Sequence, residues 1–474
     1  MGHARGFLEV KRVPAPERDP RERTADHGEI FGLLPEEELR RQGGRCMDCG
    51  IPFCHDGCPL GNLIPDWNDL VTRGRWREAI DQLHATNDFP ELTGYICPAP
   101  CEDACVLEIN DDPVMIKQVE LSIVERAWEE GWIVPRPPEG RSGRSVAVVG
   151  SGPAGMAAAA QLNRRGHRIT IFERDEAAGG LNRFGVPDHK LEKWILDRRL
   201  ATMVEEGIEL RCGVDVGRDL DPGDLHERFD AVVVAVGARV PRALEVPGAD
   251  LAGVHSAMDY LYDRNRAVAV AAGAPGAGRD GRPEITAASK RVIVVGAGDT
   301  SADCMSNAHR EGAATVIQLD TYPQPAADRP RELAGWPRTP KRLPTNYALE
   351  EGGERRSGVA VVALHADGGG RVGSVEAVET DPETREPLLG TDVTLPADLV
   401  LVAIGFSGPE PALLDGLDLE RDGRGNVLAS DYATSLTGVF CAGDARIGQS
   451  LTVTAIDEGR KCARAVHRYL ESSG

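Results

Sequence analysis

The chain has 474 residues, enough for two or three domains that each bury a hydrophobic core, and its 41% hydrophobic and 27% charged residues are ordinary for a globular protein. A formal net charge of −21 argues against nucleic acid and anionic membranes as partners, because both attract basic surfaces. The sequence contains no apolar run of membrane-spanning length and no apolar signal segment at its start, so we expect a cytoplasmic protein.

The first part of the chain is expected to be helical. Residues 1–35 are charged and contain several prolines, which predicts an extended arm. Apolar residues then recur at three-to-four spacing, for example over 67–83 and 114–131, which predicts helices interrupted by cysteine-bearing loops. We therefore assign residues 1–140 to a helical N-terminal domain that ends in a proline-rich linker.

From residue 145 the pattern changes to short β-branched runs that alternate with helices, which predicts a doubly wound α/β architecture. The stretch 267–290 is rich in Gly, Ala and Pro and is typical of a loop before a second α/β unit. Five runs are expected to form buried parallel strands: 146–150, 169–173, 231–237, 291–296 and 315–320.

The first α/β unit carries a GxGxxG pattern directly after a strand and at the start of an alanine-rich helix. Gly150 permits the tight turn, Gly152 lets a pyrophosphate approach the backbone, and Gly155 allows close packing of helix on strand. Glu173 ends the next strand, where an acid takes ribose hydroxyls. The unit therefore predicts a dinucleotide site, against the alternative of a purely structural turn.

A second unit of the same kind begins at Gly296 and Gly298, with Ser301 in place of the third glycine. Its second strand ends at Asp320, which suits a ribose 2′-hydroxyl, whereas a 2′-phosphate favours an arginine. Arginines at 310, 329 and 331 are nearby in sequence, but none stands directly at the strand end. Two such units on one chain suggest FAD in the first and NAD(P)H in the second. The residues expected to bind NAD(P)H are Gly296, Gly298, Asp299, Thr300, Ser301 and Arg310.

Seven of the eleven cysteines lie in one block, in the segments RCMDCGIPFCHDGCPLGN and CPAPCEDAC. Zinc usually binds two neat cysteine pairs, often with histidine, and it remains the alternative here. The spacing is nearer to the ferredoxin run, in which the last cysteine binds the other cluster. By that logic two [4Fe–4S] clusters are held by Cys46, Cys49, Cys54 and Cys105, and by Cys58, Cys97 and Cys101 with one ligand that is not cysteine.

The other four cysteines stand singly in apolar or helical surroundings. We expect them to be small buried side chains rather than ligands: Cys212, Cys304, Cys441 and Cys462.

The segment GVFCAGDARIGQSLTVTAIDEGRKCARAV resembles the C-terminal flavin motif of two-domain flavoproteins of the disulfide-reductase type. The resemblance implies that Gly443 and Asp444 hold the ribityl chain and that the helix from Thr452 points at the isoalloxazine. Runs 232–238 and 399–406 resemble the strands where such chains cross between domains. The resemblance implies a FAD domain interrupted by a NAD(P)H domain, which we expect as 145–285 and 406–474 around 286–405.

Almost the whole chain is similar to the glutamate synthase small (β) subunit, a module also found in dihydropyrimidine dehydrogenase. The likeness lies in RCMDCGIPFCHDGCPLGNLIPDWNDLV, FPELTGYICPAPCEDACVL, GSGPAGMAAA, GGLNRFGVPDHKLEK, EEGGER and CAGDARIGQSL. It implies hydride transfer from NADPH to FAD, then single-electron transfer through the clusters to a large subunit. That subunit carries FMN and makes glutamate from 2-oxoglutarate and glutamine, so a hetero-oligomer is implied.

The same resemblance implies roles for single residues. Gly180 and Leu181 would bind FAD, Lys190 would tune the flavin, and Glu120 would complete the second cluster. The alternatives are a surface lysine at 190 and a solvated helix glutamate at 120.

Three positions depart from the family pattern. Tyr95 stands where arginine is usual, Thr454 stands where an aromatic residue is common, and 321–330 lacks the usual arginine-bearing segment. The last leaves NADPH and NADH both open. Two other functions remain as alternatives: a stand-alone NAD(P)H:acceptor oxidoreductase of the ferredoxin type, and a FAD-binding redox-sensing or scaffold subunit.

Overall fold

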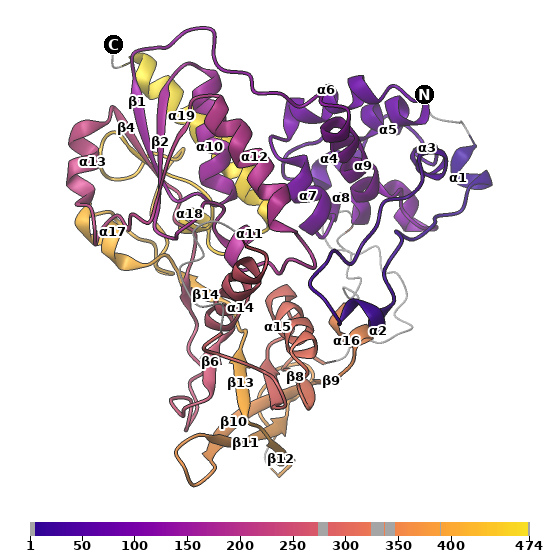
Figure 1. Cartoon of the computed structure of the whole chain (residues 1–474), viewed down its shortest axis with the longest axis vertical. Helices are drawn as coiled ribbons and strands as arrows, with labels where there is room; N and C mark the ends of the chain where they lie inside the picture. Colours follow the sequence, from indigo (N-terminus) through magenta and orange to yellow (C-terminus); the bar gives the residue numbers. More distant parts are fainter. Residues whose placement is uncertain (1–4, 274–282, 324–335, 337–346, 389, 473–474) are drawn as a thin grey trace.

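The computed structural model describes residues 5–273, 283–323, 336, 347–388 and 390–472. Figure 1 shows a helical part that contains the N-terminus, a sheet domain that contains the C-terminal helix, and a second sheet domain at the lower end of the view. Over the described ranges, no helix has the length and apolar character needed to cross a membrane.

The helical part agrees with the predicted periodicity, with one break. The expected helix over 67–83 is two helices, because Gly74 adopts a left-handed conformation (φ +72°) that ends the first of them. The arm is not fully extended, since it contains two single-turn helices. The elements are α1 (Gly6–Glu9), α2 (Pro20–Arg23), α3 (Glu36–Gly43), α4 (Phe53–Gly57), α5 (Ile64–Thr72), α6 (Trp76–Thr86), α7 (Pro90–Ile96), α8 (Pro100–Asp103), the 3-10 helix η1 (Val106–Ile109) and α9 (Ile116–Glu129).

The first sheet is parallel, with strand order β15-β4-β1-β2-β3, and its central strands are those predicted from the β-branched runs. Its strands are β1 (Ser145–Val149), β2 (Arg168–Glu173), β3 (Glu209–Cys212), β4 (Ala231–Val234) and β15 (Val439–Cys441). The helices of this domain are α10 (Pro153–Arg164), α11 (Leu181–Phe184), α12 (Lys193–Glu205), α13 (Pro222–Arg228), α17 (Pro411–Gly416), α18 (Asp444–Ile447) and α19 (Thr452–Ser472).

The close crossing of α10 and α19 positions the C-terminal segment on this sheet. A Cβ atom at Gly459 of α19 would lie 2.1 Å from the carbonyl oxygen of Ala154 of α10, so no other residue fits there without a shift of the backbone. The crossing brings the start of α19 beside the first glycine-rich turn. Segments about 300 residues apart in sequence therefore face the same space (Figure 1).

The second sheet is also parallel, with strand order β6-β13-β7-β8-β9, and an antiparallel sheet β10-β11-β12 lies beside it. Its strands are β6 (Val254–Ser256), β7 (Arg291–Val295), β8 (Thr315–Asp320), β9 (Glu354–Ser357) and β13 (Leu399–Val402), and the antiparallel ones are β10 (Val359–Ala366), β11 (Val372–Glu379) and β12 (Val393–Pro396). Its helices are α14 (Ala257–Ala271), α15 (Asp299–Arg310) and α16 (Tyr347–Glu351). The strands β5 (Val240–Pro241) and β14 (Phe406–Gly408) pair antiparallel where the chain passes between the two domains.

The domain boundary expected at residue 285 is wrong. Strand β6 pairs with β13 of the second sheet, and α14 follows it, so the chain has already left the first domain at β5. The stretch 267–290 was expected to be a loop, but α14 continues to Ala271 because its alanines favour a helix; residues 274–282 lie outside the described residues. The doubly wound fold class is confirmed, with two parallel sheets behind a helical part.

Three of the four single cysteines are buried, as expected: Cys304, Cys441 and Cys462. Cys212 differs. It is exposed, because it ends the edge strand β3, whose other residues are also exposed or half-buried.

Candidate functional site

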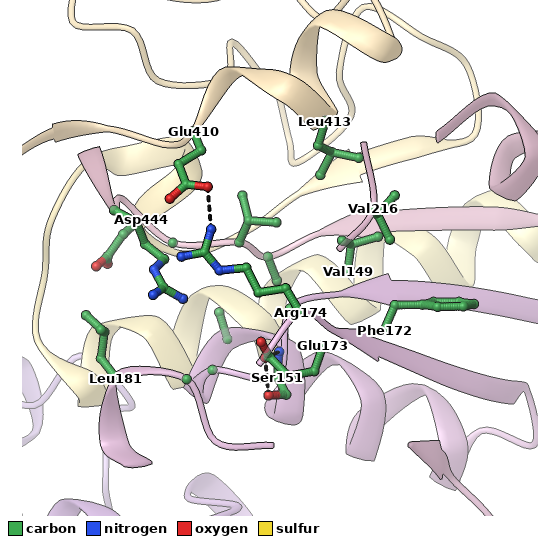
Figure 2. A pocket seen from close by; sticks show the side chains of 18 of the residues that line it. Val149, Ser151, Phe172, Glu173, Arg174, Leu181, Val216, Glu410, Leu413 and Asp444 are labelled. Atoms are coloured by element: carbon green, nitrogen blue, oxygen red, sulfur yellow. Dashed lines mark hydrogen bonds and ion pairs between the residues drawn. The ribbon is translucent and has the colours of Figure 1, made fainter. Parts of the chain in front are cut away.

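A cavity lies at the carboxyl ends of the first sheet, where parallel α/β sheets bind their ligands (Figure 2). Most of the residues expected to bind FAD line it: Gly150, Gly152, Glu173, Gly180, Leu181, Asp444 and Thr452. Gly155 and Gly443 lie behind the lining. A Cβ atom at Gly155 would be 2.0 Å from the oxygen of Gly150, so its absence permits the close packing of α10 on β1.

The first glycine-rich turn leaves room for a phosphate. Gly150 has φ +101°, and a Cβ atom there would lie 2.4 Å from the oxygen of Ala235. Gly152 directly precedes α10, and a Cβ atom on it would meet no atom within 4 Å. Open space in front of a helix N-terminus is a favourable place for an anionic group.

Glu173 braces this turn. Its Oε2 accepts hydrogen bonds from the backbone N–H (3.0 Å) and the hydroxyl of Ser151, and its Oε1 accepts one from the backbone N–H of Asp175 (2.9 Å). The Ser151 hydroxyl oxygen in turn accepts from the backbone N–H of Gly179 (2.8 Å). The carboxylate therefore ties the end of β2 to the glycine-rich turn, and the expected ribose contact stays a prediction.

Several charged residues of the cavity were not foreseen from the sequence. Arg174 pairs with Glu410, as Figure 2 shows, although the two are 236 residues apart. Asp215, Arg218 and Arg239 also line the cavity. Only Arg174, which follows Glu173 directly, carries a local signal. A helix N-terminus with arginines nearby fits the pyrophosphate of a flavin dinucleotide.

The second glycine-rich turn has the same construction. Gly296 has φ +122°, and a Cβ atom there would lie 2.3 Å from the oxygen of Ala403. Gly298 precedes α15, so Asp299 and Thr300 stand in its first turn. Ser301 is buried; its hydroxyl donates to the oxygen of Gly298 (2.9 Å) and accepts from the Gln318 amide (2.5 Å). Serine is accommodated in place of the third glycine because both of its hydrogen-bonding roles are satisfied.

An arginine that the sequence reading missed stands at the end of strand β8. Arg355 of β9 donates to Oδ2 of Asp320 (2.6 Å), because β8 and β9 pair in parallel with Gln318 opposite Arg355. Its distance along the chain hid it from motif reading. Arg329 and Arg331 lie outside the described residues.

The expectation that Arg310 binds the nucleotide is wrong. Arg310 ends α15, roughly 16 Å from Asp299 at the usual rise of a helix. Its guanidinium pairs with Glu351 (2.9 Å), and the two side chains are 1% and 0% exposed. A cation held in a buried pair at the far end of the helix does not face the glycine-rich turn.

Lys190 is not a surface lysine. Its ammonium donates to Oδ1 of Asp303 on α15 (2.9 Å) and lies over the ring of Tyr347 (5.5 Å). Burial acts to lower the pKa of Lys190, but the carboxylates of Asp303 and Asp299 outweigh it, so the pKa is raised and the side chain stays charged. Lys190 therefore links a segment of the first sheet domain to the second. Its flavin-tuning role stays a prediction.

The structure gathers the cysteine block into the two sets expected from the spacing. One small cavity is lined by Cys46, Cys49, Cys54 and Cys105 among apolar side chains. The second set is buried together in the core of the helical part: burial, followed by the neighbouring Cys58 and Cys97, raises the pKa of the Cys101 thiol well above its usual value.

Neither set is arranged as the ligands of a single metal ion would be. Across the described residues, no three His, Cys, Asp or Glu side chains converge on one point as ligands of one ion would. A [4Fe–4S] cube takes its ligands at four separate iron corners, so its ligand set is wider than that of zinc. The donor set therefore fits cubane clusters better than zinc.

Glu120 is buried beside the second set, which excludes the solvated helix position. Its Oε1 accepts hydrogen bonds from Asn87 (3.0 Å) and Thr93 (2.5 Å). Burial raises the pKa of Glu120 to about 7, although those two bonds act to lower it. Glu120 is an electrostatic neighbour of Cys58, Cys97 and Cys101.

Comparison with known families agrees with this geometry. Residues 144–459 match the model of pyridine nucleotide-disulphide oxidoreductases, and residues 23–132 match that of dihydropyrimidine dehydrogenase domain II, 4Fe-4S cluster. A solved structure, Mycobacterium tuberculosis FprA in complex with NADPH, has a similar fold. Its TM-score is 0.55 at 19% identity, over 71% of this chain and 86% of that one. The chain therefore belongs to the pyridine nucleotide-disulphide oxidoreductases and carries an additional iron–sulfur domain, which confirms the expected cofactor classes, FAD, NAD(P)H and [4Fe–4S] clusters.

Two relatives narrow the assignment. The chain is 51% identical to a glutamate synthase [NADPH] small chain of M. tuberculosis, over 100% of this chain and 97% of the relative. It is 43% identical to the glutamate synthase [NADH] of Schizosaccharomyces pombe, over 98% of this chain but 22% of that relative. Within its class, this chain belongs to the family of glutamate synthase small chains.

We call the cavity at the first sheet the flavin cavity, and the burial of Asp444 in it predicts a pH-dependent stability. Burial raises the pKa of Asp444 to about 6 from 3.8, although the Ser450 hydroxyl donates to it (2.6 Å). Ionised Asp444 therefore destabilises the folded state above about pH 6, and this effect disappears below about pH 4. We expect Asp444→Asn to increase the unfolding free energy of the flavin-free protein at pH 8 by roughly 1–3 kcal/mol. A higher melting temperature than that of wild type would be the measured result.

Asp398→Asn is the opposite-sign control. The Arg291 guanidinium holds the pKa of Asp398 at about 2, so this substitution should lower the melting temperature at pH 8. Identical melting curves for wild type and Asp444→Asn at pH 8 would contradict the prediction.

Proposed function

We propose that this chain is the small subunit of a cytoplasmic glutamate synthase. It oxidises NADPH at FAD and passes electrons through two [4Fe–4S] clusters to a large subunit that carries FMN. There, glutamine and 2-oxoglutarate would give two glutamates. The NADH-dependent form and the stand-alone reductase are outcomes that the experiments below distinguish.

One observation carries the proposal: two consecutive residues of α19 contact the flavin cavity and the core of the second cysteine set. Thr452 lines the cavity, and the next residue, Val453, is buried in the same core as Cys58, Cys97 and Cys101. Leu60 and Tyr95 pack against both this core and the core of the first sheet domain. These packed side chains join the two sites, which suits electron transfer between them.

The proposed partner rests on the relatives. The S. pombe relative carries a region like this chain as 22% of its length, so the rest of that glutamate synthase is covalently joined to such a region. The M. tuberculosis relative is named a small chain. We infer that this chain works with a separate large subunit in a hetero-oligomer.

The chain's own residues would bind and orient the groups. Bound FAD supplies the conversion of a two-electron hydride donor into single electrons. The N-terminus of α10 and the arginines of the cavity would hold its phosphates, and the turn before α15 would hold the nicotinamide nucleotide. Lys190 keeps its positive charge where the first sheet domain contacts α15 of the second.

The decisive experiment mixes the purified holoprotein with NADPH and follows flavin absorbance, first alone and then with the large subunit, glutamine and 2-oxoglutarate. We expect rapid flavin bleaching alone and glutamate formation only with the large subunit. A flavin that NAD(P)H does not bleach would favour the sensing or scaffold role. Bleaching with electron delivery to ferredoxin but not to the large subunit would favour the stand-alone reductase.

We further propose that Arg355 favours NADPH, because it places a guanidinium beside Asp320 where a 2′-phosphate would lie. We expect Arg355→Gln to raise KM for NADPH about tenfold or more while changing KM for NADH little, in steady-state assays with an artificial acceptor. Arg356→Gln on the same strand is the control, since Arg356 pairs with the exposed Glu354 instead. Equal effects of Arg355→Gln on both coenzymes would contradict this preference.

We propose Glu120 as the eighth cluster ligand, through Oε2, since both of its hydrogen bonds fall on Oε1. Wild type should contain about eight irons and eight labile sulfides. Glu120→Ala should lose or degrade the second cluster only, whereas flavin reduction by NADPH should survive because it precedes the clusters. Glu120→Cys should restore the ligand count with a shifted spectrum. Iron analysis and low-temperature EPR make the measurement.

Glu129→Ala, at an exposed position on the same helix, is the matched control and should leave both cluster signals unchanged. Two clusters in Glu120→Ala that match those of wild type would place the eighth ligand elsewhere.

A further inference from the structure

The N-terminal arm makes a loop that reaches from the helical part to the second sheet domain. We call residues 17–31 the arm loop. Its base is closed by the backbone N–H of Arg18 donating to the oxygen of Ile30 (3.0 Å), and Gln118 of α9 donates to the adjacent oxygen of Gly32 (3.1 Å). Its far end is α2, which begins with Pro20 and is capped by the side chain of Asp19. In Figure 1, α2 lies beside α16.

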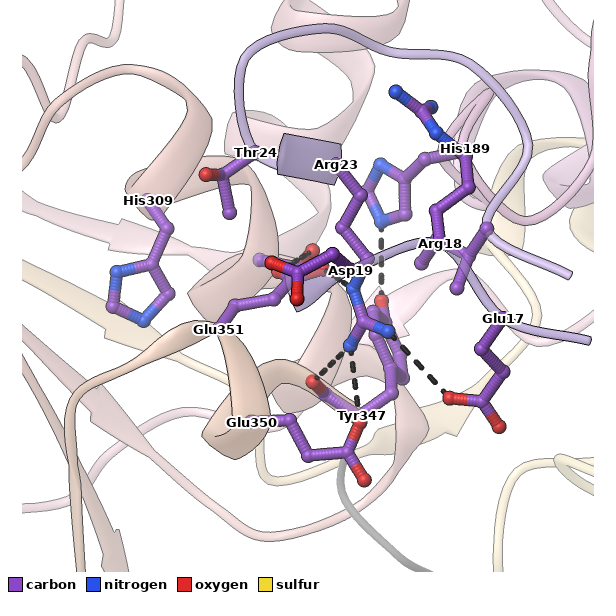
Figure 3. A network of polar contacts seen from close by, with 12 residues as sticks. Glu17, Arg18, Asp19, Arg23, Thr24, His189, His309, Tyr347, Glu350 and Glu351 are labelled. Atoms are coloured by element: carbon purple, nitrogen blue, oxygen red, sulfur yellow. Dashed lines mark hydrogen bonds and ion pairs between the residues drawn. The ribbon is translucent and has the colours of Figure 1, made fainter. Parts of the chain in front are cut away.

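Arg23, at the end of α2, is fully buried against the second sheet domain (Figure 3). Its guanidinium donates to Oε1 of Glu351 (2.8 Å) and to the backbone oxygen of Tyr347 (2.7 Å), both in α16. The half-exposed Glu350 and Glu17 lie 3.3 Å and 3.6 Å from it. Glu351 also pairs with Arg310 of α15, which donates to the backbone oxygen of Asp26 in the arm loop (3.0 Å).

The same helix α16 also contacts the first sheet domain, through Tyr347. The Tyr347 hydroxyl donates to Oδ1 of Asp303 (2.7 Å), the oxygen that also accepts from Lys190 (2.9 Å). His189 lies 3.2 Å from that hydroxyl, and its backbone oxygen accepts from Ile30 of the arm loop (3.0 Å). All three parts of the protein therefore meet at Tyr347.

The second sheet domain is thus held at its chain crossing and also at α15 and α16. At the crossing of β5 and β14, Asn265 of α14 donates to the oxygen of Phe184 (2.7 Å). At α15 and α16, Lys190 and His189 of the first sheet domain contact Asp303 and Tyr347, and the arm loop adds Arg23 from the helical part. A domain attached only at a crossing can rotate, because polar interfaces between domains permit relative motion by default. The contacts at α15 and α16 oppose that rotation, and the arm loop is the part of them that ties the second sheet domain to the helical part.

We propose that Arg23 is a positioning residue that fixes the second sheet domain, where NADPH would bind, against the flavin cavity through Tyr347, Asp303 and Lys190. This role rests on the proposed hydride transfer from NADPH to FAD. Hydride transfer needs the reacting atoms about 3–3.5 Å apart, and a displacement of about 1 Å can cost about a hundredfold in rate. Arg23 touches neither site, so its loss slows transfer between the domains without removing a group that binds either coenzyme.

The test compares holoprotein variants by rapid mixing with NADPH. Arg23→Met keeps the length of the side chain and removes its charge and hydrogen bonds. We expect flavin reduction to be slowed about tenfold to a hundredfold, with an unchanged dissociation constant for NADP+, so that kcat falls and KM does not rise. Arg23→Lys keeps the charge and should recover part of the rate. Dithionite should reduce flavin and clusters in all variants as in wild type.

Arg18→Met is the matched control, because Arg18 pairs with Asp26 within the arm loop, and it should reduce its flavin at the wild-type rate. If Arg23→Met does not fold, Glu350→Lys sets a like charge beside Arg23 from a half-exposed position and should slow reduction in the same way.

Folded, cofactor-loaded Arg23→Met or Glu350→Lys that is reduced at the wild-type rate overturns the positioning role. So does a loss of NADP+ affinity that accounts for the whole effect. Failure of NADPH to reduce the wild-type flavin would instead refute the proposed function.

Discussion

The rest of the structure depends on the approach of α19 to α10, which is possible only because position 459 has no side chain. This contact closes the flavin cavity with residues from both ends of the interrupted domain. It also places the first turn of α19 against the core that holds the second cysteine set. A bulkier residue at 459 would separate the two helices and with them the flavin cavity from the cysteine core, so one steric constraint governs both sites.

A buried carboxylate locks the same crossing from the helical part. Asp88 accepts hydrogen bonds from Gln161 and Arg164 of α10 and pairs with Arg460 of α19 (2.8 Å). Burial acts to raise the pKa of Asp88, but Arg164 and Arg460 outweigh it and hold the pKa below its usual value. Truncating a buried charge of this kind is costly because its partners are left unpaired. The helical part therefore holds α10 and α19 of the first sheet domain together, in addition to carrying the cysteine block.

The sequence predicts local features of this fold well, and long-range ones only where a motif reaches across the chain. The glycine-rich turns and the central strands are readable because strand burial and tight turns leave patterns within about ten residues. The boundary at 285 was misplaced because β6 is three residues long and pairs with a strand about 145 residues later. Arg355 and Glu410 were missed for the same reason. Parallel pairing of β9 with β8 brings Arg355 to its site, and the return of the chain to the first sheet domain brings Glu410 to the cavity. Neither arrangement leaves a signal in the neighbouring sequence. Arg310 shows the converse. It is close in sequence to the second glycine-rich turn, but it lies at the opposite end of α15 from that turn.

The alternation at the start of α19 limits how this protein can change. Consecutive residues of a helix point about 100° apart, so Thr452 serves the cavity and Val453 the cysteine core through the phase of a single turn. Side chains in this turn can vary in size or polarity while each still faces its own compartment. A one-residue insertion or deletion would turn the following side chains by about 100° away from their compartments and would misplace Gly459 at the crossing with α10. In this segment, therefore, the number of residues is more tightly constrained than the identity of each side chain.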